Sequence, residues 1–301
     1  MNRLYEQYVR KEALPTVFCP GCGDGTVLQA FLRAVDQTSY QDRLALVGGI
    51  GCSGWIPTYV QADVLHTTHG RAIPFAMGLK LTDPSRKVVV FTGDGDCVGI
   101  GGNHFLHAAR RNVDMTVILI NNQIYGMTGG QMAPTTPYGG RTQTSPYGNA
   151  ERSMDACGVA IAAGATFVAR WTAGQTAQLA ETIKQALDHP GFAFIEVLSQ
   201  CPVQAGPHLY GTEDAPEVLN DIRARTVSIR RWDKLPPEER EGKWSIGLLH
   251  RVEGVPEFAQ ELAAIRERAQ GSMRAQTQEA PHERASDTGR QAAAQQAPTG
   301  R

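Results

Sequence analysis

The segment KVVVFTG at residues 87–93 is the feature that most limits the fold of this chain. Its apolar residues are consecutive rather than alternating, which is typical of a strand buried on both faces of a parallel sheet. Similar runs recur, and we expect further strands at residues 44–51, 115–122, 166–170 and 192–199. Helical, alanine-rich segments separate them, at residues 70–81, 103–111, 154–163, 176–187 and 256–268. We therefore predict an α/β fold with a mostly parallel sheet and helices on both faces.

Composition narrows the classes of function. Hydrophobic residues make up 42% of the 301 residues, and the formal net charge is −1 without a block of like charges. This argues against a nucleic-acid partner or a polybasic membrane contact. The N-terminus lacks the apolar core of a signal peptide, and no 18-residue apolar run follows. We expect a cytoplasmic protein, in which six cysteines serve metal or redox chemistry rather than disulfides.

The sequence divides into three parts. Residues 1–207 hold all the expected strands. Residues 208–269 have a looser pattern, and we expect them to pack on the first part or on a partner. Residues 270–301 contain Gln, Ala, Arg, Thr and Gly without aromatic residues, so we expect a disordered tail or at most a fraying helix.

A glycine-rich loop, TGDGDCVGIGG at residues 92–102, follows the strand at 87–93. A loop of this kind commonly binds a phosphate, but Asp94 and Asp96 would repel one. A dinucleotide site would need an acidic residue at the end of the next strand, where Asn121 and Asn122 stand instead. The nucleotide P-loop pattern is also absent. A divalent cation between Asp94 and a diphosphate resolves the repulsion, with amide oxygens of the asparagine pair as further ligands.

The spacing of these ligands supports that interpretation. Between Gly95 and Asn121 lie 25 residues, enough for a loop, a helix and a strand that return the chain to the same sheet edge. Gly-Asp-Gly followed at this distance by Asn-Asn is typical of thiamine-diphosphate enzymes. The alternative is two unrelated loops of common residues.

Four cysteines form a second candidate group. Cys19 and Cys22 form a C-x-x-C loop, and Cys52 and Cys201 each follow a predicted strand. The second C-x-x-C of a zinc ribbon is missing, so the set favours a [4Fe–4S] cluster. Cys52 and Cys201 as ordinary buried thiols remain the alternative. Neither of the two remaining cysteines has a C-x-x-C partner, and we expect both to be core residues; they are Cys97 and Cys157.

Six sequence motifs follow one another within residues 16–207. They are FCPGCGDG, GIGCSGW, HTTHGRA, TGDGD with IGGNHFLHAARRN, NNQIYGMTGGQ and QCP. The chain resembles the β subunits of 2-oxoacid:ferredoxin oxidoreductases, most of all those of the 2-oxoglutarate branch. The resemblance implies that the [4Fe–4S] ligands are Cys19, Cys22, Cys52 and Cys201. It implies a magnesium site made by Asp94, Asn122 and the main-chain carbonyl of Ile124. It implies that thiamine diphosphate contacts Ile50, Gly51, Cys52, Ser53, His69, Gly93, Asp94, Gly95, Gly126 and Met127. Tyr125 is left out as a packing residue.

The resemblance also implies a reaction and partners. The expected activity is oxidative decarboxylation of a 2-oxoacid, most of all 2-oxoglutarate, to an acyl-CoA, with electrons passed through the cluster to ferredoxin. Thiamine chemistry needs a glutamate on a pyrimidine-binding domain, and we expect an α subunit to carry it because this chain has no second such domain. The catalytic residue is therefore unknown here. Trp55 stands where a basic residue could pair with a distal carboxylate.

Three alternatives stay open. The substrate could be pyruvate or a branched 2-oxoacid. The chain could belong to a non-oxidative thiamine-diphosphate decarboxylase or synthase with incidental cysteines. It could also be an electron-transfer subunit with a decayed cofactor site, which the presence of Asp94 and Asn122 disfavours.

Overall fold

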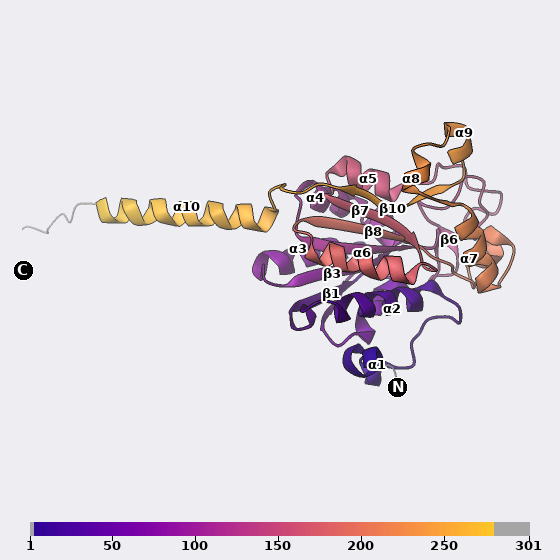
Figure 1. Ribbon diagram of the computed structural model, residues 1–301, viewed down its shortest axis with the longest axis horizontal. Helices are drawn as coiled ribbons and strands as arrows, with labels where there is room; N and C mark the ends of the chain where they lie inside the picture. The colour runs from indigo at the N-terminus through magenta and orange to yellow at the C-terminus, as the bar shows by residue number, and fades with distance from the viewer. Residues whose placement is uncertain (1–2, 280–301) are drawn as a thin grey trace, which may run out of the picture. The chain divides into compact units, whose positions relative to one another are not determined.

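The structure is a computed structural model that describes residues 3–279. One compact unit extends to Glu261, and a second unit begins at Leu262. The first unit holds an eight-stranded sheet with the order β2-β1-β3-β4-β8-β7-β10-β9 (Figure 1). The strands from β2 to β7 in this order all run parallel, and β10 pairs antiparallel with β7. The predicted α/β fold with a mostly parallel sheet is confirmed.

The sheet strands are β1 (Leu44–Gly48), β2 (Asp63–His66), β3 (Lys87–Gly93), β4 (Met115–Asn121), β7 (Phe167–Thr172), β8 (Phe192–Leu198), β9 (Thr226–Ser228) and β10 (Trp244–Arg251). A separate hairpin is formed by β5 (Ile124–Tyr125) and β6 (Gln131–Met132). The helices are α1 (Arg3–Tyr8), α2 (Gly23–Asp36), α3 (Ala72–Thr82), α4 (Gly102–Arg110), α5 (Ala156–Ala163), α6 (Thr176–Asp188), α7 (Ala215–Ala224), α8 (Ile229–Trp232), α9 (Pro237–Arg240) and α10 (Phe258–Glu279). Short helical turns are η1 (Lys11–Ala13), η2 (Gln41–Arg43), η3 (Ser53–Tyr59), and the π-helical turns η4 (Gly95–Ile100) and η5 (Gly206–Tyr210).

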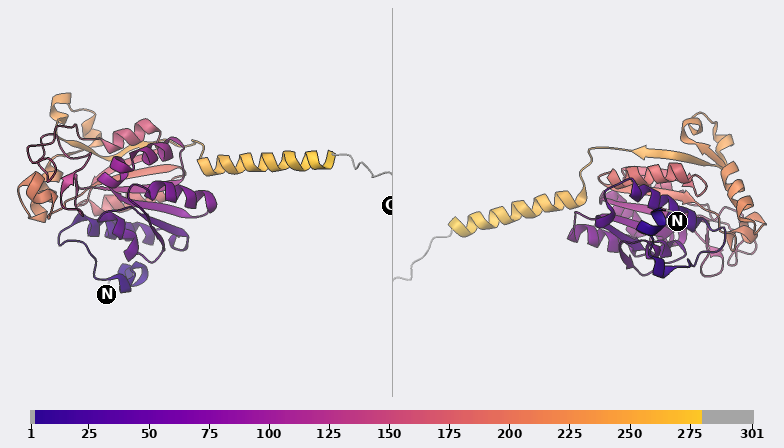
Figure 2. Two further views of the ribbon diagram at one scale, coloured as in Figure 1. Left: turned by 180° about the vertical axis from the view of Figure 1, so that it is seen from behind. Right: turned by 60° about the horizontal axis from the view of Figure 1, so that its bottom comes forward.

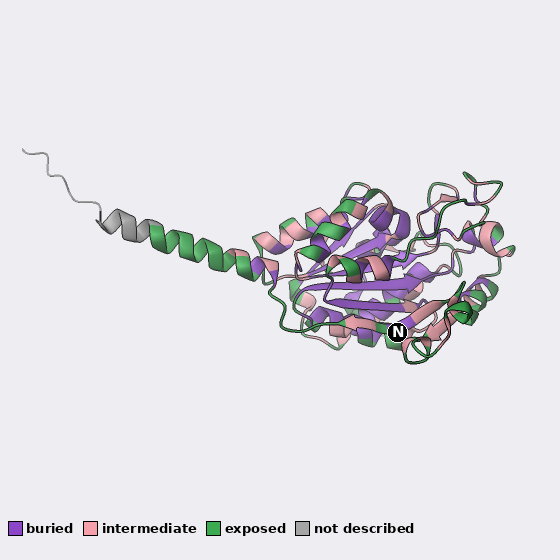
Figure 3. Cartoon of the chain, turned by 90° about the horizontal axis from the view of Figure 1, so that it is seen from above, coloured by how far each residue is buried: buried purple, intermediate pink, exposed green. Residues whose placement is uncertain are grey.

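Helices cover both faces of the sheet (Figures 1 and 2). On one face α2 and α6 pack against alternate strand residues, with Phe31 of α2 edge-on to Phe91 of β3. On the other face α3, α4 and α5 cover the intervening residues, and Phe105 of α4 lies against Phe194 of β8. Strands β4 and β8 are buried along their whole length and β3 along all but its two end residues (Figure 3), which explains why their sequences are continuously apolar.

All five predicted strands and all five predicted helices are present, most with ends shifted by a few residues, whereas the helix predicted at residues 256–268 continues to Glu279. Sequence reasoning missed α2, β2, and the strands β9 and β10 that extend the sheet beyond β7. Residues 208–261 thus belong to the same compact unit as the predicted first part. Within the predicted tail, α10 includes residues 270–279, and residues 280–301 lie outside the described residues. None of the described helices is both long and apolar enough to span a membrane.

Candidate functional site

A cavity opens at the carboxyl ends of the parallel strands. The loops after β1, β2, β3 and β4 supply its walls, as expected for ligand sites in parallel sheets. Its lining comprises Asp24, Ile50, Gly51, Cys52, Ser53, His69, Gly93, Asp94, Gly95, Asp96, Ile120, Asn122, Ile124, Tyr125, Gly126, Met127 and Thr128. Every residue that the family resemblance implies for thiamine diphosphate or magnesium is in this set, whereas Asn121, the other predicted amide ligand, is not. The structure therefore gathers these residues at one place, and their individual roles stay predictions.

Asp94 is a buried carboxyl group without a counter-ion. It follows β3 directly, only 2% of it is exposed, and the Thr135 hydroxyl donates to its Oδ2. Burial raises the pKa of Asp94 to about 7 because removal from water disfavours the charged form. A carboxyl group in this state gains stability from a cation that enters the cavity.

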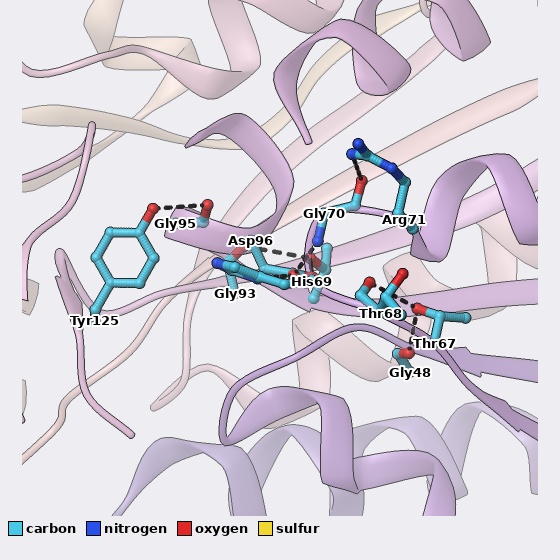
Figure 4. A network of polar contacts seen from close by, with 11 residues as sticks. Gly48, Thr67, Thr68, His69, Gly70, Arg71, Gly93, Gly95, Asp96 and Tyr125 are labelled. Carbon is cyan, nitrogen blue, oxygen red and sulfur yellow. Dashed lines mark hydrogen bonds and ion pairs between the residues drawn. The ribbon is translucent and has the colours of Figure 1, made fainter. Parts of the chain in front are cut away.

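Asp96, the second acid of the loop, has a different role, since protein groups already satisfy both of its oxygens (Figure 4). His69 Nδ1 lies 2.5 Å from Oδ1, and the Gly70 amide donates to the same oxygen over 2.7 Å. The Thr92 hydroxyl donates to Oδ2. Because a carboxylate only accepts, Nδ1 is the donor and Nε2 of His69 is left available. Helix α3 begins at Ala72, three residues after His69, and the contact with Asp96 positions the His69 ring.

The asparagine pair at the end of β4 is split between the core and the cavity. Asn122 lines the cavity, and its Oδ1 accepts from the Ile124 amide over 3.1 Å. Asn121 is only 4% exposed and donates to Glu196 inside the sheet over 2.7 Å. The expectation that both side chains supply metal ligands was therefore wrong for Asn121. Successive residues of a strand point to opposite sides, so one of two neighbours turns away.

Tyr125, which was left out of the site as a packing residue, both packs against the glycine loop and lines the cavity. Its hydroxyl donates to the Gly95 carbonyl over 3.0 Å, and its ring lies edge-on to His69 (Figure 4). A Cβ at Gly95 would lie 2.2 Å from this ring. Glycine is thus required at residue 95 for close packing against an aromatic side chain.

The C-x-x-C loop is tied to the segment that carries Cys201. The Gly23 amide donates to the Gln200 carbonyl over 3.2 Å, and the Gln200 side chain donates to the Gly21 carbonyl over 3.0 Å. A Cβ at Gly23 would lie 2.1 Å from the Ser199 hydroxyl, so only glycine permits this approach. These contacts bring the C-x-x-C loop next to the segment that carries Cys201, although the two are about 180 residues apart in the sequence.

Burial and nearby negative charge both raise the pKa of two of these thiols. Burial raises the pKa of Cys52 to about 12, with further contributions from charge on Asp24, Cys201 and Cys19. Burial also raises the pKa of Cys22, and negative charge on Asp24 and Cys201 adds to the effect. Among residues 3–279, however, no three His, Cys, Asp or Glu side chains are arranged to hold a single metal ion.

The other two cysteines, Cys97 and Cys157, are core residues as predicted, with 2% and 1% exposed.

Asp24 is a further lining residue that the sequence did not single out. It lies in the first turn of α2, only 3% of it is exposed, and its Oδ2 accepts from the Cys22 thiol. Its Oδ1 has no hydrogen-bond partner among the described residues. Burial raises the pKa of Asp24 to about 6. The signal was hidden because α2 begins with Gly-Asp-Gly, which resembles a loop.

Comparison with known proteins agrees with this geometry. Residues 49–197 match the family model described as the thiamine pyrophosphate enzyme, C-terminal TPP binding domain. The 2-oxoglutarate synthase subunit KorB of Methanocaldococcus jannaschii is 48% identical over 87% of this chain and 97% of that protein. The 2-oxoacid:ferredoxin oxidoreductase subunit beta of Saccharolobus solfataricus is 40% identical over 78% of this chain and 77% of that protein. The chain belongs to the 2-oxoacid:ferredoxin oxidoreductase β-subunit family.

A solved structure gives the same result for the fold of this family member. The 2-oxoglutarate:ferredoxin oxidoreductase from Magnetococcus marinus, with 2-oxoglutarate, coenzyme A and succinyl-CoA bound, matches with a TM-score of 0.78. The match has 33% identity and covers 92% of this chain and 96% of that one. The predicted thiamine-diphosphate-binding fold and the predicted class of oxidoreductase are confirmed.

The state of Asp94 gives a testable prediction about the ligand-free chain. Its pKa rises from 3.8 to about 7 on folding, so its contribution to stability is full below pH 4 and is lost as the pH rises through 7. We expect Asp94→Asn to raise the melting temperature at pH 8 in magnesium-free buffer by roughly 5 °C, and to change it little at pH 4. Thermal denaturation monitored by circular dichroism measures this.

Asp63→Asn is the control, because the Asp63 side chain is 70% exposed and its burial changes little on folding. An equal effect of Asp94→Asn at both pH values would contradict the assignment of an uncompensated buried carboxylate.

Proposed function

We propose that this chain is the β subunit of an enzyme that oxidatively decarboxylates 2-oxoglutarate to succinyl-CoA and passes the electrons through a [4Fe–4S] cluster to ferredoxin. One observation carries the proposal. All the residues that the family resemblance implies for thiamine diphosphate and magnesium line a single cavity at the carboxyl edge of the sheet. The relatives that are named 2-oxoglutarate synthase subunits, at 48% to 54% identity, support the choice of substrate.

The cavity suits a magnesium diphosphate. Asp94 offers a buried carboxylate, Asn122 an amide oxygen, and Ile124 a main-chain carbonyl, all three of which line it. Magnesium takes oxygen ligands and is commonly held by one or two carboxylates together with phosphates, so a small protein share is sufficient. The cation would also offset the negative charge of Asp94 that burial now disfavours.

The other lining residues have roles around that anion. Gly93 and Gly95 would let the main chain approach the diphosphate closely. His69, oriented by Asp96, has Nε2 free, and this nitrogen can donate to an anionic ligand when both ring nitrogens carry a proton. When bound, thiamine diphosphate supplies a carbanion that attacks a 2-oxo carbon and stabilises the charge left by decarboxylation.

The magnesium site is tested by ligand substitution. In the complex of this chain with its partner subunit, Asp94→Ala should weaken magnesium-dependent binding of thiamine diphosphate by about 100-fold, and Asn122→Ala by about tenfold. Because the pKa of Asp94 is about 7, binding to the unmodified complex should strengthen as the pH rises from 6 to 8. Isothermal titration calorimetry measures both effects.

Asp83→Ala is the matched control, since Asp83 is exposed and outside the cavity. Unchanged affinity in Asp94→Ala would assign the metal to other residues.

The four thiols suit an iron–sulfur cluster better than a single ion. Each cysteine of a [4Fe–4S] cluster binds a different iron, so the sulfur atoms need not meet at one point, which agrees with the absence of a single-ion site among residues 3–279. Burial disfavours the thiolates of Cys22 and Cys52 without a metal, and iron would offset their charge. Cys52 lines the cavity, so a cluster here would lie beside the bound cofactor.

Substitution by serine tests the cluster ligands. The complex with Cys19→Ser, Cys22→Ser, Cys52→Ser or Cys201→Ser should lose most of its cluster iron and visible absorbance, because a hydroxyl binds iron poorly in place of a thiolate. Iron and sulfide analysis after anaerobic reconstitution measures this, against the complex without substitution.

Cys97→Ser and Cys157→Ser are the matched controls and should retain full iron, since both residues are buried in the core. A full iron content in the Cys201→Ser complex would reject this ligand set.

The cavity also indicates which groups a partner must supply. Its described lining includes three aspartates but no glutamate, lysine or arginine. We propose that an α subunit provides the glutamate that activates the aminopyrimidine ring, together with a cation for the distal carboxylate of 2-oxoglutarate. Trp55, 37% exposed and stacked near His66, offers no such cation. The residue at this strand end is Asn121 rather than an acid, and its side chain is turned into the core. The acidic residue that would hold a nicotinamide ribose is therefore missing at this position.

An assay of the assembled complex tests the reaction. The chain alone should be inactive, and the complex should reduce ferredoxin or a viologen dye with 2-oxoglutarate and coenzyme A under anaerobic conditions. Pyruvate and branched 2-oxoacids should react at least about tenfold more slowly, which corresponds to about 1.4 kcal/mol of discrimination.

A preference for pyruvate would reject 2-oxoglutarate as the substrate but not the oxidative decarboxylation. Turnover by this chain alone would reject an active site that is shared with a partner subunit. A complex that decarboxylates without iron would identify a non-oxidative enzyme. Rapid NAD reduction without a flavin subunit would reject ferredoxin as the acceptor.

A further inference from the structure

A buried ion pair lies directly behind the cavity. Glu196 of β8 and Arg170 of β7 are 2% and 4% exposed, and Arg170 Nε donates to Glu196 Oε2 over 2.6 Å. Arg170 also pairs with Asp155, and the Cys157 thiol donates to Glu196 Oε2. Apolar replacement of buried ion pairs is often neutral or stabilising, so the stability of the sheet alone does not explain this pair.

The other oxygen of Glu196 connects the pair to the site. Glu196 Oε1 accepts from Asn121 Nδ2 over 2.7 Å, and Asn121 Oδ1 in turn accepts from the Gln123 amide over 3.0 Å. The Asn121 side chain thus holds the main chain on both sides of Asn122. Neither Asn121 nor Glu196 lines the cavity, so both can act on a ligand only through Asn122 and its neighbours.

Gln123 fixes the other half of the loop. Its φ of 64° is in the left-handed region, which is uncommon for a residue other than glycine. The Thr136 hydroxyl donates to its carbonyl and the Tyr210 hydroxyl to its side chain, each over 2.6 Å. Residues 121 and 123 are therefore anchored inside the protein, and Asn122 and Ile124 face the cavity.

We propose that Glu196 and Asn121 are positioning residues for the magnesium site. Glu196, held by Arg170, orients the Asn121 amide, and Asn121 sets the turn that presents the Asn122 side chain and the Ile124 carbonyl toward Asp94. This rests on the magnesium site of the proposed function. It adds that the affinity of that site is set by hydrogen bonds inside the sheet as well as by the ligands themselves.

The test measures the magnesium requirement for cofactor binding. Thiamine diphosphate is titrated calorimetrically into the complex of this chain with its partner at a series of magnesium concentrations. In Asn121→Ala, we expect the magnesium concentration for half-maximal binding to rise about tenfold, because the loop loses the two hydrogen bonds that the Asn121 side chain makes. Thermal denaturation of each variant is recorded in parallel.

Asn112→Ala is the matched control. Asn112 precedes β4, is also 4% exposed, and accepts from the Phe192 amide and the Thr166 hydroxyl over 2.8 Å each. It thus makes comparable buried contacts at the opposite end of the same strand. We expect Asn112→Ala to lower the melting temperature without changing the magnesium requirement. An unchanged magnesium requirement in Asn121→Ala would overturn the proposal.

Two further variants keep the test decisive. Asn121→Ser substitutes for Asn121→Ala if the alanine variant does not fold, with the same expected direction. Glu196→Gln keeps an oxygen that accepts from Asn121, so it should retain the magnesium requirement of the unmodified complex even where it lowers stability. A tenfold rise in Glu196→Gln would contradict positioning through this hydrogen bond. An unmodified complex that binds thiamine diphosphate without magnesium would instead reject the proposed metal site itself.

Discussion

The carboxyl group of Asp94 is held away from water at the end of a buried strand, and the site depends on this. Ionisation at this position is unfavourable, as its pKa of about 7 shows, so the ligand-free fold keeps a group that an entering cation would stabilise. Thr135 supplies one hydrogen bond, and no lysine or arginine is in the described lining of the cavity. Neutralisation of the negative charge of Asp94 therefore requires a ligand. Folding has already imposed the free-energy cost of burying the Asp94 carboxyl group, and a bound cation would remove part of that cost. This gain adds to the binding free energy and favours binding of a metal ion together with an anion.

The parallel sheet supplies the geometry that this requires. Because β2, β1, β3, β4 and β8 are neighbours and end at the same edge, loops from distant parts of the sequence meet there. Close approach then depends on small residues. Gly49 is an example, since a Cβ there would lie 1.9 Å from the Asp96 carboxylate. That carboxylate holds His69 and is itself held by Thr92 of β3, so one side chain connects the loop after β2 with the loop after β3.

The sequence predicted the strands and the cavity residues well because both leave local signals. Continuous apolar runs identify buried parallel strands, and the glycines around Asp94 identify a loop that ligands approach. The orientation of Asn121 left no such signal, since it depends on Glu196, which is 75 residues away in the sequence. Tyr125 and Thr135 were missed for a similar reason, because their contacts form only when the loop after β4 folds back on the loop after β3. Helix α2 was missed because glycines occupy its first turn.

Two apolar side chains near the described site are exposed to solvent. Met127 lines the cavity and is 49% exposed, and Val203, two residues after Cys201, is 51% exposed. Under the proposed function, a partner subunit would cover this part of the surface. Such a cover would also exclude water from the cavity, which strengthens the interaction of Asp94 with a bound cation. Burial disfavours the charged form of Asp94 in the isolated chain. Under the proposed function, the same burial would strengthen the interaction of Asp94 with the cation in the assembly, where the partner subunit would supply the groups missing from this lining.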